Sequence, residues 1–169
     1  TNQTLDPIMI DNVTSQAPEA QPHVLSFPYD GGTASFVAEF EVFDFEASLR
    51  FWSDLIGFRF MFGRKGFAYL SRGSADIMIA QVSGHWQTAP LEAPLGRGVN
   101  FKFFVEDVEA LADRITAAGW PFFQPLHEAW YGADGIERGY RQFLIQDPNG
   151  YLLRFARKLG SRITMRSDP

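Results

Sequence analysis

Hydrophobic positions from residue 36 onward recur first with the period of a strand and then with that of a helix. Alternate apolar positions share one face of the first segment: Phe36, Ala38, Phe40 and Val42. The next apolar positions follow helical spacing: Phe45, Leu49, Trp52 and Ile56. Because strand side chains alternate between two faces while helical ones return every three to four residues, these patterns predict a strand followed by an amphipathic helix.

Residues at both ends of this helix, and of a second one, mark where each begins and stops. Asp44 and Asp107 directly precede the two helical patterns, where a carboxylate accepts hydrogen bonds from the free N–H groups of the first turn. Gly57 and Gly119 follow the patterns, at the left-handed position that favours glycine. The second apolar stripe consists of Val108, Leu111, Ala112 and Ile115.

The middle of the chain contains an internal repeat. Residues 40–47 align with residues 103–110, with Phe, Val, Asp, Glu and Ala coinciding. Aromatic-rich or alternating segments after each helix predict strands at 58–62, 67–70, 77–81, 121–125, 141–146 and 151–156. The sequence Asp147-Pro148-Asn149-Gly150 predicts a tight hairpin turn between the last two strands. We therefore expect an α+β fold with two βαβββ modules.

The segments outside the repeat differ from it in charge and pattern. Residues 1–33 hold four carboxylates and no Lys or Arg, and they lack sustained periodicity. We expect them to form an N-terminal arm that lies along another surface or crosses to a partner. The domain is expected at 34–158, with modules at about 34–83 and 98–158, and residues 159–169 are expected to be a solvated basic tail.

Three motifs carry a resemblance to a known family. The chain contains Val-x-Asp-Phe-x-x-Ser-x-x-Phe-Trp-x-x-x-x-Gly-Phe at 42–58, Gly-Phe-Ala-Tyr-Leu-Ser-Arg-Gly at 66–73 and Asp-Pro-Asn-Gly-Tyr-Leu-Leu-Arg-Phe at 147–155. Over residues 36–158 it resembles the vicinal oxygen chelate superfamily, and within it the glyoxalase/bleomycin resistance proteins. The resemblance implies tandem βαβββ modules in two curved mixed sheets. It also implies a homodimer whose ligand clefts lie at the interface.

Metal-dependent members of that superfamily place His or Gln early in the first strand of a module and Glu near the end of the last. The corresponding positions here hold Val37, Asn100 and Arg154, and the first module offers only Met78 or Ala80. Apolar side chains and a permanent cation do not suit a divalent ion. The three histidines, His23, His85 and His127, have no spacing typical of ligands. We expect no metal site and no cofactor, and we lean against an enzyme.

Candidate ligand-binding residues lie on the strand faces opposite the helices and in the loops. In the first strand these are Glu39 and Glu41, and the repeat superposes Glu39 on Lys102. Either Glu39 and Lys102 form an ion pair in the cleft, or a carboxylate receives a cationic group of a ligand. Arg154 either neutralises those carboxylates or binds an anionic or carbonyl group.

Aromatic side chains complete the candidate set, because flat rings stack on planar ligands and attract cations. The segment 126–138 is expected to be a loop that determines specificity. Bleomycin-binding relatives place Trp where this chain has Arg138, so Tyr140 or Trp130 is expected to supply the ring. The full candidate set is Glu39, Glu41, Phe67, Tyr69, Trp86, Lys102, Phe104, Trp130, Tyr131, Arg138, Tyr140 and Arg154.

Composition narrows the function classes. The chain has 20 Asp and Glu against 15 Lys and Arg, a net charge of −5, which disfavours a nucleic-acid partner. It has no cysteine, which excludes thiolate chemistry, and no apolar run long enough to span a bilayer. We expect a soluble cytoplasmic protein that sequesters a small cationic aromatic molecule, as in antibiotic resistance. A lyase, isomerase or dioxygenase with an unusual metal site, and a regulatory protein-interaction domain, remain alternatives.

Overall fold

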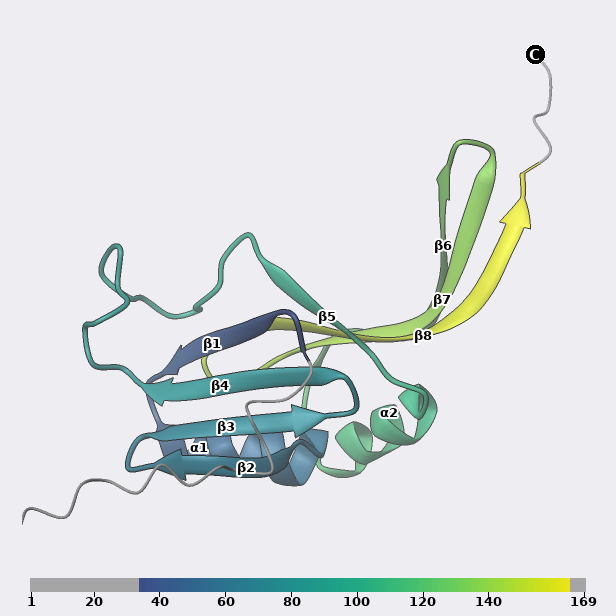
Figure 1. Cartoon of the computed structure of the whole chain (residues 1–169). Helices are drawn as coiled ribbons and strands as arrows, with labels where there is room; N and C mark the ends of the chain where they lie inside the picture. Colours follow the sequence, from purple (N-terminus) through teal and green to yellow (C-terminus); the bar gives the residue numbers. More distant parts are fainter. Residues whose placement is uncertain (1–33, 165–169) are drawn as a thin grey trace, which may run out of the picture. The chain divides into compact units, whose positions relative to one another are not determined.

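The computed structural model describes residues 34–164 of the chain, and it contains two modules of the same topology (Figure 1). The elements of the first module are β1 (Val37–Val42), α1 (Phe45–Arg50), η1 (Phe51–Ile56), β2 (Arg59–Arg64), β3 (Phe67–Arg72) and β4 (Ala75–Gln81). Those of the second are β5 (Asn100–Phe104), α2 (Val108–Ala117), β6 (Phe122–Ala133), β7 (Ile136–Gln146) and β8 (Leu152–Ile163).

Each module forms one open four-stranded sheet. The strand orders are β1-β4-β3-β2 and β5-β8-β7-β6. The first strand of each module runs parallel to the last, and the other neighbours run antiparallel. The prediction of an α+β fold with tandem βαβββ modules in mixed sheets is therefore confirmed. The expected N-terminal arm at 1–33 lies outside the described residues.

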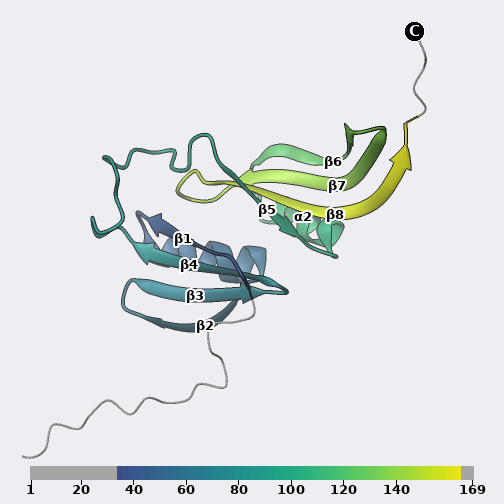
Figure 2. The same ribbon diagram turned by 45° about the horizontal axis from the view of Figure 1, so that its top comes forward.

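One face of each sheet packs against helices. Figure 2 shows α1 and α2 behind the strands of their sheets, and we call the opposite surface of each sheet its helix-free face. Phe40 and Val42 of β1 are buried on the helix side, as are Phe143 and Phe155 of the second sheet. Phe101 and Phe103 of β5 also pack against the core. The residues that alternate with these core positions therefore point to the helix-free faces, as expected for β1 and β5. None of the helices among residues 34–164 is long and apolar enough to cross a bilayer.

The two modules share one hydrophobic core. Trp52 of η1 is fully buried, and its ring lies 5.9 Å from that of Phe103 on β5. The rings of Phe40 and Phe101 lie 4.6 Å apart in an edge-on arrangement. Such aromatic pairs bury large apolar areas, so they hold the modules together.

The helix ends follow the sequence with one exception. The Asp44 carboxylate accepts a hydrogen bond from the Ala47 N–H at 2.9 Å, as expected of an N-cap. Gly57 and Gly119 both have positive φ. Asp107 forms no such cap, contrary to expectation. Its carboxylate instead accepts two hydrogen bonds from the Arg72 guanidinium, at 2.8 and 2.9 Å.

The strands of the second module are longer than the sequence indicated. The expected loop at 126–138 is wrong, because β6 and β7 continue through it to a turn at Asp134 and Gly135, both with positive φ. Likewise β8 runs to Ile163, so residues 159–163 are strand and not tail. Arg162 stabilises the extension through a 2.6 Å ion pair with Glu137 on β7.

The turn at 147–150 joins the two modules through buried hydrogen bonds. Gly150 has φ of 98°, and its N–H donates to the Asp147 carbonyl, which confirms the predicted turn. The Asn149 amide nitrogen donates to the Ser48 hydroxyl of α1 at 3.0 Å, and the Asn149 amide oxygen accepts from the Phe43 N–H at 2.8 Å. This Asn149 clamp connects the end of one module to the start of the other.

Candidate functional site

The helix-free face of the first sheet borders a cavity of about 530 Å³. Three residues singled out from the sequence meet there: Glu39 of β1, Phe67 of β3 and Trp86 of the segment after β4. Trp86 is 72% exposed, and Glu39 is exposed without an ion pair among the described residues. Arg64 also lines the cavity and lies over the Phe67 ring at 4.3 Å.

Two other candidates on this face are packed and do not line the cavity. Tyr69 is buried and stacks on Phe62 at 4.9 Å, and its hydroxyl donates to Asp76 at 3.1 Å. Glu41 is also buried, and its Oε1 has no hydrogen-bond partner among the described residues. Burial, together with the nearby charges of Asp147 and Glu41, raises the pKa of Tyr151 to about 12.

The helix-free face of the second sheet brings together cations and aromatic rings. The Lys102 ammonium lies 3.4 Å from the centre of the Tyr140 ring and 5.1 Å from that of Phe104. Lys158 lies 4.8 Å from the Phe104 ring. Burial lowers the pKa of Lys102, and the positive charges of Arg154 and Lys158 lower it further.

The remaining candidates divide between the two faces of the long hairpin. Tyr131 lies opposite Arg138 and near Tyr140, with ring centres 6.0 Å apart, on the helix-free side. Trp130 points to the other face, where it packs against Gly139 and lies under the Arg162 guanidinium at 4.1 Å. The two neighbours therefore cannot contact the same ligand on one face of the sheet.

The ion pair between Glu39 and Lys102 that the repeat suggested is not formed. No ion pair within residues 34–164 joins them, and Lys102 lies beside Arg154 in the register of β5 and β8. The carboxylate and the ammonium occupy equivalent positions on different sheets, each the third residue of its strand. Equivalent position in a repeat therefore does not imply contact.

The sequence-based prediction did not include Lys158, Gln142 and Arg64 among the site residues. Lys158 follows Arg154 and Ala156 by alternation, so it would have been found had β8 been extended beyond residue 156. Gln142 is 1% exposed and contacts the Tyr131 hydroxyl at 2.8 Å. Gln142 lies between Arg141 and the apolar run at 143–145, so no local pattern marks it as buried.

Among the described residues, the side chains that could bind a divalent metal ion do not cluster. Within residues 34–164 no group of three His, Asp or Glu side chains is arranged to hold a metal ion. The positions where the superfamily places ligands hold Val37, Asn100 and Arg154, whose side chains are apolar, a weak amide and a permanent cation. The side-chain chemistry of these three residues therefore does not suit a divalent metal ion.

Comparisons with known proteins place this fold in one class of α+β proteins with paired βαβββ modules. Residues 17–155 match the model of the Glyoxalase/Bleomycin resistance protein/Dioxygenase superfamily. The chain belongs to this superfamily. A search among curated proteins finds no match.

Several solved structures have a fold similar to that of this chain. TioX from Micromonospora sp. ML1 is 24% identical with a TM-score of 0.61, covering 76% of this chain and 100% of that one. A virulence protein from Salmonella typhimurium is 20% identical, with a TM-score of 0.54 and coverage of 72% and 93%. A superfamily member from Alicyclobacillus acidocaldarius is 18% identical, with a TM-score of 0.53 and coverage of 73% and 90%. At these identities the similarity concerns the fold alone.

Proposed function

We propose that the chain binds and sequesters a small molecule with a cationic group and an aromatic ring, without a metal and without transforming it. The observation that carries the proposal is the cavity on the first sheet, where Glu39, Phe67 and Trp86 meet. Its volume of about 530 Å³ falls in the range of about 300–1,000 Å³ typical of small-molecule sites.

The cavity residues have complementary roles in this proposal. Glu39 supplies the charge that attracts a cation: it forms no ion pair with any described residue, although Arg64 and Lys65 line the same cavity. Trp86 and Phe67 supply ring faces for stacking and cation–π contact. Arg64 covers Phe67 in the free protein, so the ligand displaces Arg64 from that ring on binding.

We also propose that two copies of the chain associate through the helix-free faces. Exposed aromatic side chains on both sheets support this, among them Phe62, Phe104 and Tyr131. Sedimentation equilibrium measures the mass in solution, and a monomer at all concentrations would contradict this part of the proposal.

The binding test is calorimetric titration of the full-length protein with bleomycin and other cationic aromatic compounds. Glu39→Gln should weaken binding about tenfold, because one charge-assisted contact in a partly desolvated site is worth about 1.5 kcal/mol. Trp86→Ala should weaken it by a similar factor. Glu46→Gln, an exposed position in the first turn of α1, is the matched control and should leave affinity unchanged.

Two results would contradict the proposal and favour an enzymatic function. Elemental analysis that finds one tightly held divalent ion per chain would favour a lyase, isomerase or dioxygenase of the superfamily. Conversion of a bound compound to a product in the same titration mixture would do the same. If the protein protects cells against the compound it binds, expression in a sensitive strain should raise the inhibitory concentration, and Glu39→Gln should remove most of that protection.

A further inference from the structure

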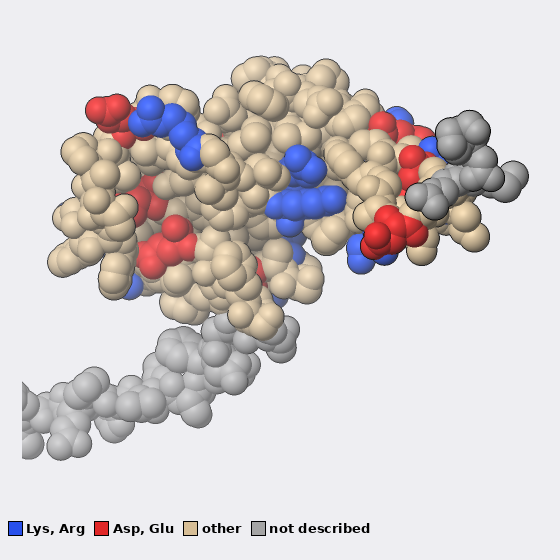
Figure 3. All heavy atoms as spheres, turned by 90° about the horizontal axis from the view of Figure 1, so that it is seen from above, with Lys and Arg blue, Asp and Glu red and all other residues tan. Residues whose placement is uncertain are grey.

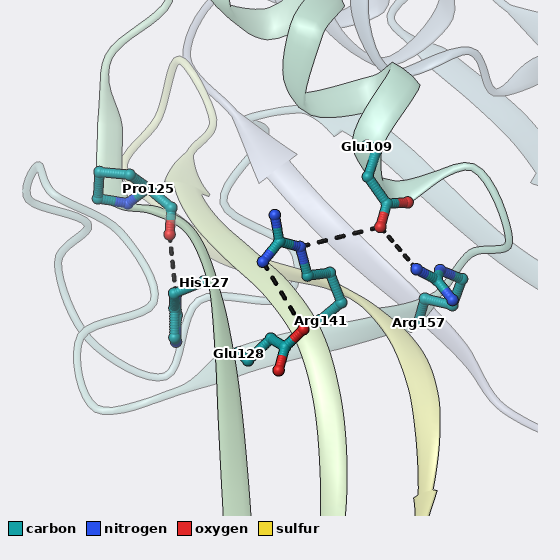
Figure 4. Close-up of polar contacts among 6 residues, drawn as sticks. All are labelled: Glu109, Pro125, His127, Glu128, Arg141 and Arg157. Atoms are coloured by element: carbon teal, nitrogen blue, oxygen red, sulfur yellow. Dashed lines mark hydrogen bonds and ion pairs between the residues drawn. The ribbon is translucent and has the colours of Figure 1, made fainter.

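Among the described residues of the second sheet, the cations of the helix side are paired with carboxylates, whereas those of the helix-free face are not. On the helix side, the Glu109 carboxylate of α2 pairs with Arg157 at 2.6 Å and with Arg141 at 3.8 Å (Figure 4). Arg141 also reaches Glu128 at 3.9 Å. These cations are therefore compensated by carboxylates, and the Arg157 hydrogen bond lowers the pKa of Glu109.

The cations of the helix-free face have no such partners. Lys102, Arg138, Arg154 and Lys158 form no ion pair with any carboxylate among residues 34–164. Register places Lys102 beside Arg154 and Lys158 opposite Tyr140. Figure 3 shows Lys and Arg side chains gathered in the middle of the surface seen from above, apart from Asp and Glu side chains grouped to the left.

Two buried side-chain atoms on this face have no hydrogen-bond partner within the described part of the chain. They are Nε of Arg154 and Oε1 of Gln142, a residue that is 1% exposed. The Gln142 amide nitrogen is already engaged with the Tyr131 hydroxyl. Buried polar groups are nearly always paired in folded proteins, so an unpaired guanidinium donor among other cations indicates a group supplied from outside.

A small cavity on the long hairpin shares Tyr140 and Lys158 with this group of cations and rings. It has a volume of about 220 Å³ and is lined by Arg138, Tyr140, Lys158, Ser161 and the two glycines between them, Gly139 and Gly160. Two cations and two hydroxyl groups therefore face a space that no carboxylate lines. Such a donor set suits a carboxylate, sulfonate or phosphate group.

We propose that the helix-free face of the second sheet is an anion site for a small aromatic molecule that carries a carboxylate, sulfonate or phosphate group. Lys102, Arg154 and Lys158 hold the anion, and the rings of Phe104 and Tyr140 contact the aromatic part. The site lies on a different sheet from the Glu39 cavity and does not depend on the function proposed for that cavity.

The experiment uses 1-naphthalenesulfonate as the probe, with the full-length protein and isothermal titration calorimetry. Neutral 1-naphthol has the same ring system without the charge, and sodium sulfate has the charge without the ring. We expect the sulfonate to bind at least about tenfold more tightly than either, because charge-assisted contacts and ring burial act together. Affinity should fall as salt concentration rises.

Charge-removing variants on the two faces provide the decisive comparison. Lys102→Met and Arg154→Met should each weaken sulfonate binding about tenfold. Lys158→Met tests an exposed position whose loss does not threaten folding. Arg157→Met removes the same charge from the opposite face and should change affinity less than about twofold. Circular dichroism melts confirm that each variant is folded.

Several outcomes would overturn the anion site. Equal weakening by Arg157→Met and Lys102→Met would show a nonspecific charge effect, and equal binding of 1-naphthol would show an apolar patch only. Tighter binding of a single-stranded oligonucleotide than of the sulfonate would point to a nucleic-acid surface. Lack of sulfonate binding would contradict the site. Glu39→Gln leaves this titration unchanged, so failure here is distinguishable from failure of the cation site.

Discussion

Replacing Asn149 with alanine tests whether the Asn149 clamp holds the two modules together. The side chain is 4% exposed and makes three hydrogen bonds, with the Phe43 N–H, the Ser48 hydroxyl and the Asp147 carboxylate. A neutral hydrogen bond contributes about 1 kcal/mol and one to a charged group about 1.5–3 kcal/mol. Because Ser48 and Asp147 are buried, they would be left without this partner away from water. Asn149→Ala should therefore lower the free energy of unfolding by about 3–4 kcal/mol.

Urea denaturation followed by tryptophan fluorescence measures this loss, with the slope of free energy against urea as a check on two-state behaviour. A loss of that size should lower the melting temperature by about 10 °C in a domain of this length. Gln146→Ala is the matched control, because it removes an exposed amide that donates to Gly150 on the same turn. It should cost less than about 1 kcal/mol. An Asn149→Ala variant as stable as this control would refute the reasoning.

Two further changes test the turn and a surface ion pair. Gly150→Ala should destabilise the domain by about 2 kcal/mol or more, because its φ of 98° strains an alanine and the new Cβ would collide with Pro94. Thermal melts should show a smaller loss for Gly73→Ala, which also has positive φ but faces open space. Arg72→Met should cost up to about 1 kcal/mol at pH 7. Burial raises the pKa of Asp107, but the Arg72 hydrogen bond and charge lower it overall. The contribution is therefore present above the unfolded pKa of about 3.9 and lost as pH falls below it, so equal urea midpoint differences at pH 7 and pH 3 would contradict it.

The fold was largely predictable because its signals are local. The apolar periods of β1 and α1, and the turn at Asp147, depend on neighbouring residues and appear in the sequence directly. The length of β6 and β7 was not predictable in the same way. Their outer halves are stabilised by contacts across strands, such as Arg162 with Glu137 and with the Trp130 ring. Those contacts are between residues up to 32 positions apart, and local pattern does not encode them.

The face on which the candidate strand residues lie was predictable, but their grouping was not. Alternation identified Glu39 and Lys102 as facing away from the helices, which the structure confirms. It did not show that the two lie on different sheets without contact. The sequence pattern assigned the Asp107 carboxylate to the N-cap of α2. In the structure this carboxylate instead accepts a hydrogen bond from Arg72, whose long side chain reaches it from β3 in the other module. Tertiary contacts of this kind override local preference.

The equivalence of Glu39 and Lys102 also bears on how one topology presents two unlike surfaces. Both are the third residue of the first strand of a module, and both point away from the shared core. Because neither side chain belongs to that core, the packing that holds the two modules together does not fix the charge at this position. The same backbone arrangement therefore presents an acid in one module and a base in the other, with no difference in strand topology.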